Sequence, residues 1–211
     1  MESKINVSLR IKPLSKTESL HEKNHLWSKI SDNSVMNKRT KEVYAFDQVY
    51  GDDIRTKEIF DNEVKEIVKA ALTGINQTVF VYGQTSSGKT HTMKGYEQGG
   101  GEEGLIPLSI REIYDIIKQE SSREFEIKVS YIEIYNESVN DLIEPMNKNL
   151  EVRESISNGI YINRLCEKSV GSYEDVIAEL LKGDEFRSIA ATKLNELSSR
   201  SHTVFRINIS S

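Results

Sequence analysis

Residues 83–90 constrain this chain more than any other stretch, because they read Gly-Gln-Thr-Ser-Ser-Gly-Lys-Thr, the pattern G-x-x-x-x-G-K-[ST]. In this pattern the glycines let successive backbone N–H groups face a polyphosphate, the lysine reaches the β- and γ-phosphates, and the last hydroxyl ligates Mg²⁺. The alternative is a chance glycine turn. The flanks favour a nucleotide site, because the strand-like run 76–82 precedes the motif and a helix can follow it. The predicted phosphate-binding residues are Gly83, Gln84, Thr85, Ser86, Ser87, Gly88, Lys89 and Thr90, and Thr90 is also a predicted metal ligand.

Apolar periodicity predicts strands that alternate with helices on both sides of this motif. A period of two predicts strands, and a period near 3.6 predicts helices. Thr56 is the expected N-cap and Gly74 the expected stop of the first long helix. The expected strands are 5–11, 43–50, 76–82, 125–134 and 204–209, with short strands in 140–165. The expected helices are 56–71, 105–119 and one opening at Ser172. Residues 14–42 are expected to be loops with weak short strands, and the glycine-rich 95–104 is an expected loop. The fold class predicted is α/β, with a central, mostly parallel, twisted sheet and helices on both faces.

Composition excludes several classes of protein. The length of 211 residues suits one domain, and the net charge of -5 argues against a basic nucleic-acid binder. Cys166 is the only cysteine, so neither an internal disulfide nor a cysteine zinc site is expected, and a reducing compartment fits. The first residues lack the pattern of a secretory signal and no run is long enough to span a membrane. We therefore expect neither nucleic acid nor membrane as a partner.

A second polar cluster, residues 195–202, reads Asn-Glu-Leu-Ser-Ser-Arg-Ser-His between a predicted helix and a predicted strand. A loop of this kind can close over a γ-phosphate, with hydroxyls on phosphate, water and metal. Composition alone favours a solvated polar connection instead.

Together, the two clusters resemble those of the kinesin motor domain. GQTSSGKT followed by HTM is similar to the kinesin phosphate loop, and NELSSRSH is similar to its first switch. VSLRIKPL resembles the adenine-side segment R-x-R-P, and SYIEIYNESVNDLI resembles the central strand. The resemblance implies a P-loop NTPase fold over residues 1–211 with a switch I-like loop at 192–202. The segments REFEIKVSYIEIYNE and ATKLNELSSRSHTVFRI most resemble those of the centromere-associated class of kinesins.

The resemblance also implies roles for individual residues. Arg10, Lys12 and Pro13 would frame the adenine, with His91 on its other side. Lys12 stands where the family usually has arginine, so a stacked guanidinium is lost. The alternatives are an exposed strand-end cation for Lys12 and an ordinary surface residue for His91. The implied catalytic residues are Asn195, Ser198, Ser199 and Arg200, with Ser199 also at the metal; Arg187 would assist this switch or be a solvated arginine.

The family's second switch, D-L-A-G-S-E, does not occur in these 211 residues. The resemblance therefore implies the N-terminal portion of a motor domain, incomplete relative to a full one. A fragment of a longer protein and a shortened gene product both fit. We expect this chain by itself to be catalytically impaired, since phosphoryl transfer depends on positioning by every wall of the site. Dimerisation is expected only through regions outside this sequence.

The function implied is the ATP-binding part of a microtubule-based motor that couples ATP hydrolysis to movement along microtubules, in the cytoplasm and cytoskeleton, including spindle or kinetochore. Its ligands would be ATP and Mg²⁺.

Tubulin is acidic, so among the residues present the turn region 148–164, with Lys148, Arg153 and Arg164, is the candidate contact; a solvated hairpin is the alternative. Two other functions compete: a truncated or degenerate non-motor nucleotide-binding or partner-interaction module, and a different phosphate-loop enzyme such as a small-molecule kinase, for which no lid signature is seen.

Overall fold

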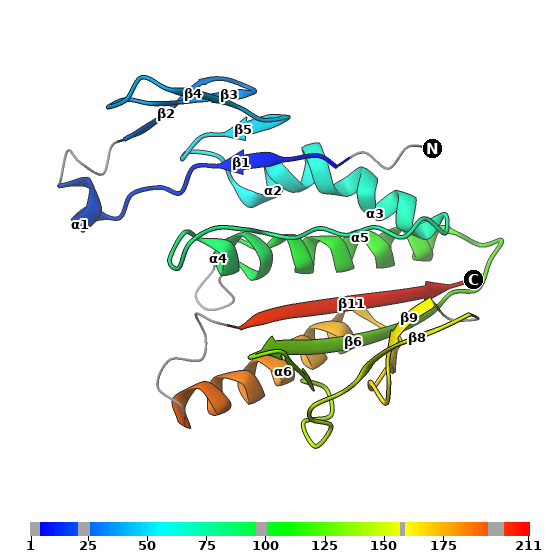
Figure 1. Ribbon diagram of the computed structural model, residues 1–211. Coiled ribbons are helices and arrows are strands. Elements are labelled where there is room, and N and C mark those ends of the chain that lie inside the picture. The colour runs from blue at the N-terminus through cyan, green and yellow to red at the C-terminus, as the bar shows by residue number, and fades with distance from the viewer. Residues whose placement is uncertain (1–4, 21–25, 96–100, 157–158, 194–200) are drawn as a thin grey trace. The chain divides into compact units, whose positions relative to one another are not determined.

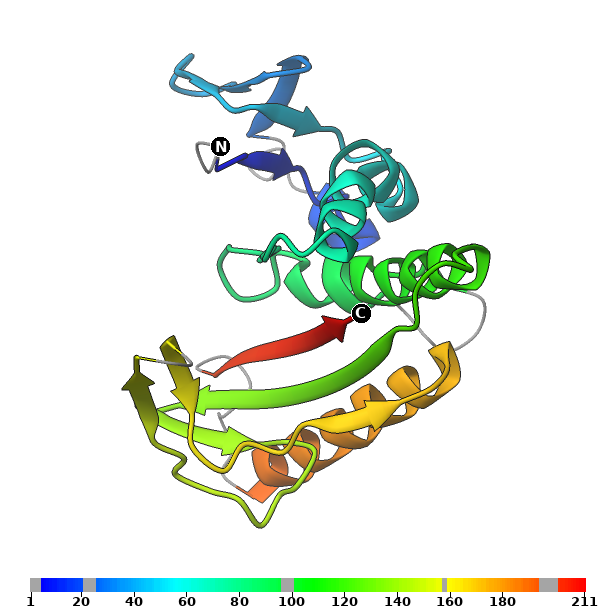
Figure 2. The same cartoon turned by 90° about the vertical axis from the view of Figure 1, so that its right-hand side faces the viewer.

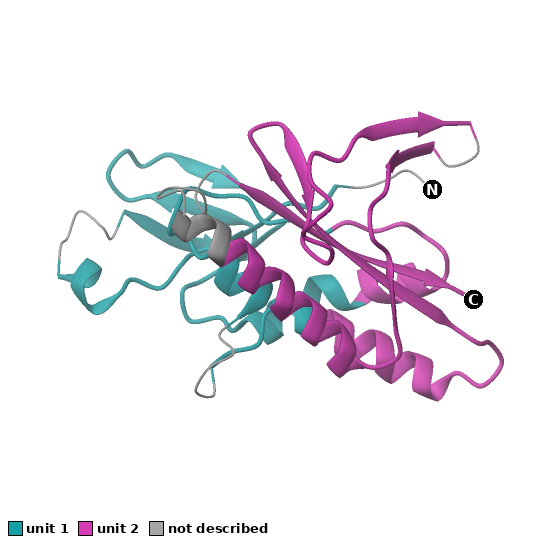
Figure 3. Ribbon diagram, turned by 90° about the horizontal axis from the view of Figure 1, so that it is seen from below, with its two compact units in different colours: residues 1–65, 79–108 teal, residues 66–78, 109–211 magenta. Residues whose placement is uncertain are grey.

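The computed structural model describes residues 5–20, 26–95, 101–156, 159–193 and 201–211 (Figure 1). The chain divides into two compact units (Figure 3). Unit 1 comprises Met1–Lys65 and Val79–Leu108, and unit 2 comprises Glu66–Thr78 and Ser109–Ser211. Each unit has its own sheets and its own buried residues, and each is described by itself.

Unit 1 holds two small sheets. Strand β1 (Ser8–Arg10) pairs in parallel with β5 (Gln48–Tyr50), which places Leu9 opposite the fully buried Val49. The second sheet is antiparallel and contains β2 (Trp27–Ser31), β3 (Ser34–Asn37) and β4 (Val43–Ala45); a short helix, α1 (Lys16–Ser19), precedes it. The expected strand 43–50 is therefore two strands in different sheets. The break lies at Asp47, whose backbone N–H donates to the carbonyl of Val7 and whose carboxylate accepts from the N–H of Val7.

A long helical run follows in the expected place, as α2 (Thr56–Ile59), a π-helical turn η2 (Phe60–Val64) and α3 (Lys65–Leu72). Its start differs from the prediction. Thr56 is the first helical residue rather than the N-cap, and Arg55 is the cap, with its N–H donating to the carboxylate of Glu58 at 3.2 Å. Thr56 is fully buried, and its hydroxyl accepts from Arg10, 46 residues earlier in the chain.

The expected strand at 76–82 is not formed. These residues have no strand assignment, and the side chains of Phe80 and Tyr82 are 76% and 96% exposed. An apolar, β-branched pattern records what a segment prefers, but a strand also needs hydrogen-bonding neighbours. None of the described residues pairs with this segment in a ladder. Among the ladders of the described residues only β1–β5 is parallel, so the predicted parallel pairing is limited to that pair.

Unit 2 is built around β6 (Glu126–Tyr135), which matches the expected strand 125–134. Strand β11 (His202–Ser210) runs antiparallel along one edge of β6 for its full length, as Figure 2 shows. The other edge carries β10 (Lys168–Val170) at one end and β7 (Ser138–Asp141) at the other. Strands β8 (Val152–Ser155) and β9 (Gly159–Ile162) form a separate hairpin.

Two helices accompany this sheet. The helix α5 (Leu105–Gln119) has the predicted bounds, and α6 (Tyr173–Lys193) opens after Ser172, whose hydroxyl accepts from the N–H of Asp175. Helix α6 packs closely on β6, since a Cβ added at Gly183 would lie 2.5 Å from the ring of the buried Tyr131. In the part of the chain that is described, no helix is both long and apolar enough to cross a membrane.

Candidate functional site

The loop at 83–90 folds back on itself in unit 1. The N–H of Ser87 donates to the carbonyl of Gln84 at 3.2 Å, which closes a turn. Gly88 then has φ +97° and caps the short helix α4 (Lys89–Lys94), a left-handed conformation that favours glycine. A Cβ at Gly83 would lie 2.5 Å from the hydroxyl oxygen of Ser87. The loop is therefore a cradle that is tightly packed at Gly83, while Gly88 supplies the left-handed residue at the start of α4.

Lys89 spans this cradle. Its Nζ donates to the carbonyl of Gly83 at 2.7 Å and to that of Gln84 at 2.9 Å. The ammonium thus lies across the first two residues of the loop, while the side chains of Thr85 and Thr90 are exposed. A cation held over a glycine turn, with hydroxyls beside it, is the donor set that suits a polyphosphate with its magnesium ion. The residues present therefore fit such a ligand.

Arg10, at the end of β1, is anchored by three neighbours in the same unit. Its Nη1 donates to the hydroxyls of Thr56 at 2.9 Å and Thr92 at 3.0 Å, and its Nη2 donates to the carbonyl of Ile54 at 3.2 Å. Thr92 lies in α4, so Arg10 connects β1 with the helix that follows the phosphate loop. Burial lowers the pKa of Arg10, and the charge of Glu102 opposes that shift.

Glu102 is a residue that the sequence patterns missed. One of its carboxylate oxygens accepts from the backbone N–H of Thr56, and the other lies 3.8 Å from Arg10 Nη2 and 3.8 Å from His91 Nε2. His91 therefore shares a carboxylate with Arg10, as expected if both serve one site. Glu102 follows a run of three glycines, a pattern that predicts a loop. Its role is seen only from its contacts with Arg10 and Thr56, which are far away in the sequence.

Lys12 lies beside the phosphate loop, but its ammonium group pairs with Glu18. The side-chain stem comes within 3.9 Å of a Cβ built at Gly88, whereas Nζ pairs with Glu18 at 3.1 Å. Hydrogen bonds from the backbone and hydroxyl of Ser15, and then from Lys12, lower the pKa of Glu18 to about 2. Pro13 is exposed next to Lys12. The structure thus brings Arg10, Lys12 and His91 into the unit that holds the loop.

The predicted residues Asn195, Ser198, Ser199 and Arg200 lie outside the described residues. Their neighbour Arg187, in α6, is described and is not a solvated arginine. Its Nε donates to the carboxylate of Glu133 at 3.1 Å, and its Nη2 donates to the hydroxyl of Ser201 at 2.9 Å. Glu133 is only 5% exposed, on β6. Arg187 therefore fixes Ser201, at one end of the switch-like stretch, to the sheet of unit 2.

The turn region 148–164 forms the β8–β9 hairpin together with its flanks. Arg153 pairs with Glu151 at 2.5 Å, and this carboxylate raises the pKa of the guanidinium. The backbone carbonyl of Arg164 accepts from the amide of Asn147. Because the carboxylate of Glu151 offsets the charge of Arg153, this hairpin has less of the positive character expected of a tubulin contact. The exposed apolar side chains of Val152 and Ile160 lie on the same hairpin.

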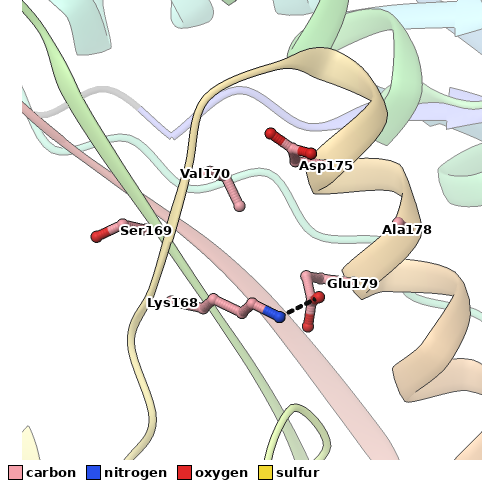
Figure 4. Close-up of a pocket in the computed structure, with 6 residues that line it drawn as sticks. All are labelled: Lys168, Ser169, Val170, Asp175, Ala178 and Glu179. Carbon is pink, nitrogen blue, oxygen red and sulfur yellow. Dashed lines mark hydrogen bonds and ion pairs between the residues drawn. The ribbon is translucent and has the colours of Figure 1, made fainter.

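A cavity of about 270 Å³ lies in unit 2, between β10 and the first turns of α6 (Figure 4). The ammonium of Lys168 and the carboxylate of Glu179 form an ion pair there at 2.5 Å. The cavity is lined by Lys168, Ser169, Val170, Asp175, Ala178 and Glu179. None of the predicted nucleotide residues is among them, so the cavity is distinct from the candidate site.

Comparison with known proteins identifies what this arrangement is similar to. The family model described as the kinesin motor domain matches residues 10–211. Kinesin-like protein KIN-7O of Arabidopsis thaliana is 41% identical over 208 residues, which cover 99% of this chain and 16% of that protein. Kinesin-like protein KIN-7E, chloroplastic, of Oryza sativa subsp. japonica is 40% identical over 208 residues, covering 98% of this chain and 18% of that protein.

A solved structure agrees with the sequence matches. The structure described as "Structure of a fast kinesin: Implications for ATPase mechanism and interactions with microtubules" superposes with a TM-score of 0.88 at 31% identity. The match covers 97% of this chain and 59% of that chain. This likeness confirms the predicted α/β fold of the P-loop NTPase class. The chain spans between 16% and 23% of the length of the curated relatives it matches.

Proposed function

The chain belongs to the kinesin motor domain family, and from that premise we propose that it is the ATP- and Mg²⁺-binding part of a motor that couples ATP hydrolysis to movement along microtubules. The observation that carries this proposal is the ammonium of Lys89 held across the glycine cradle at 83–90, inside a chain that matches the family from residue 10 to its last residue. A polyphosphate is the ligand for which such a cation and cradle are suited.

The residues divide by the part of the nucleotide that each would hold. Backbone N–H groups of residues 84–90 and the ammonium of Lys89 would bind the phosphates. Arg10, Lys12, Pro13 and His91 would lie at the base. The hydroxyls of Thr90 and Ser199 would hold the magnesium ion, which, when bound, neutralises charge that develops on the phosphate oxygens.

Asn195, Ser198, Ser199 and Arg200 would form the segment that responds to the γ-phosphate. The support for this role is their order in the sequence and the anchoring of Ser201 by Arg187. Switch segments change position when a γ-phosphate is gained or lost.

Microtubules are the proposed partner, and the cytoskeleton is the proposed location. The finer assignment to the centromere-associated class, with a spindle or kinetochore location, is part of this proposal. It rests only on the resemblance of two sequence segments to that class. The β8–β9 hairpin is the proposed contact among the described residues, through its exposed apolar side chains more than through Arg153.

The test is ATP turnover by the purified full-length protein with and without microtubules. We expect microtubules to stimulate turnover, and Ser199→Ala to reduce the Mg²⁺-dependent rate. Absence of stimulation in a folded sample would contradict the motor function. Microtubule affinity that is equal with ATP and ADP would instead support a non-motor interaction module, since a partner that does not distinguish two states cannot drive a transition between them.

Binding calorimetry with ATP and GTP tests the nucleotide assignment separately. We expect ATP to bind more tightly than GTP. A preference for GTP would contradict the base-side roles of Arg10, Lys12, Pro13 and His91 while leaving the phosphate roles intact.

A further inference from the structure

Glu102 connects three parts of unit 1 that the proposed nucleotide site needs in register. It accepts from the first N–H of α2, at Thr56, and lies against the guanidinium of Arg10 on β1 and the imidazole of His91 on α4. The side chains of Glu102 and Arg10 are 26% and 16% exposed, so this carboxylate is partly withdrawn from water. One side chain therefore bridges a strand end, a helix start and the helix that follows the phosphate loop.

The backbone that carries Glu102 packs closely against the end of α4. A Cβ at Gly104 would lie 2.4 Å from backbone atoms of Met93 and Lys94, and the N–H of Gly104 donates to the carbonyl of Lys94 at 3.3 Å. Gly95 and Glu103 also form an isolated β-bridge. The two glycines thus let the chain return against the end of α4, and this contact sets the position of Glu102 relative to His91.

The charge of Glu102 offsets the cost of burying Arg10. Burial lowers the pKa of the Arg10 guanidinium, and the Glu102 carboxylate is the group that opposes this shift. Without that carboxylate, the partly buried cation would keep, among the described residues, the neutral acceptors of Thr56, Thr92 and Ile54. A buried charge that loses its counter-ion shifts toward water or reorients.

We propose that Glu102 is a positioning residue for the base end of the nucleotide: it holds Arg10 and His91 in the orientation in which they contact the base. This inference rests on the proposed function. It assigns to one carboxylate of the glycine-rich segment 95–104 a part in base affinity, distinct from the phosphate grip of Lys89.

The experiment compares two magnesium-bound ligands, ATP and inorganic triphosphate, by equilibrium binding to the purified wild-type protein and to Glu102→Gln. Inorganic triphosphate has the phosphates without the base. We expect Glu102→Gln to weaken ATP binding about tenfold, the scale of one charge-assisted hydrogen bond, with triphosphate binding unchanged. Glu103→Gln, the same chemical change at an exposed neighbour, should alter neither affinity.

A double-mutant cycle separates positioning from general damage. If Glu102 acts through Arg10, then Arg10→Lys combined with Glu102→Gln should bind ATP no more weakly than Arg10→Lys by itself. Additive losses, an equal loss for ATP and triphosphate, or an unchanged ATP affinity would each overturn the inference. Wild-type protein that binds neither ligand would instead refute the proposed function, and thermal unfolding of each variant identifies any that is misfolded.

Discussion

The ammonium of Lys89 lies 2.7 Å from the carbonyl oxygen of Gly83, so the lysine of the phosphate loop is hydrogen-bonded to the glycine that begins it. This contact shapes the loop and places a cation where phosphates would bind. Lys89→Ala removes both the loop brace and the charge. We expect the affinity for magnesium ATP to fall about ten- to a hundredfold, the range of a strong charge-assisted hydrogen bond.

Fluorescence titration with a nucleotide analogue measures this loss. Lys57→Ala is the matched control, because its ammonium pairs with Asp61 on an exposed helical surface of the same unit. The control should bind as the wild type does, and a Lys89→Ala protein with wild-type affinity would show that the site is misplaced.

Gly104→Ala should destabilise unit 1. The added Cβ would overlap backbone atoms of Met93, Lys94 and Gly95, which cannot rotate away as a side-chain end can. We expect the free energy of unfolding in urea to fall by about 1–3 kcal/mol, the usual cost of overpacking. At Gly171 the nearest atom to an added Cβ is 3.6 Å away, so Gly171→Ala is the control and should leave stability nearly unchanged. Equal stability of the two variants would refute the close glycine packing.

Arg187→Met should destabilise unit 2, because it leaves the carboxylate of Glu133 buried without its cation. Breaking a buried pair by removing one partner costs about 3 kcal/mol or more. Arg153→Met breaks an exposed arginine–glutamate pair and should cost about 1 kcal/mol or less. Chemical unfolding of both variants makes the comparison. Similar losses in the two would mean that the Glu133–Arg187 pair is not buried in solution.

Tyr131 should make the stability of unit 2 depend on alkaline pH. Burial raises the pKa of its phenol, and the nearby carboxylate of Asp184, which accepts its hydrogen bond at 2.7 Å, raises it further. The unfolded chain then loses this proton first, so the stability that Tyr131 contributes is complete below the unfolded pKa and is lost as pH rises above it. We expect the free energy of unfolding to fall as pH rises above about 10, the usual pKa of an unfolded tyrosine, and to fall less steeply in Tyr131→Phe. An identical slope in the variant would exclude Tyr131 as a source.

The local sequence pattern was sufficient to predict structure where the residues of one segment determine its conformation. The bounds of α5 follow from its apolar period, and the turn at 84–87 follows from the spacing of the motif. The strand expected at 76–82 failed because Phe80 and Tyr82 have the right residue types but no hydrogen-bonding neighbour among the described residues. Residue type predicts the preference of a segment, whereas pairing depends on where another segment lies.

The site shows the same division. The place of Lys89 in the loop was predictable because it depends on residues within the motif, whereas its contact with phosphates stays a prediction. Thr56 was misassigned as a helix cap because its hydroxyl accepts from Arg10, a contact across 46 positions that no local pattern contains. Glu102 was missed for the same reason, since three preceding glycines predict flexibility and its partners lie elsewhere in the sequence.

Photolabelling tests the central claim most directly, since that claim is that residues 83–90 hold the phosphates of ATP. The reagent is ATP with a photoreactive group on its γ-phosphate, bound to the purified protein with Mg²⁺ and mapped by peptide mass spectrometry. We predict label in the peptide that contains residues 83–90, removed by excess ATP and lost in Lys89→Ala. Label that avoids residues 83–90, or that excess ATP does not displace, would contradict the account.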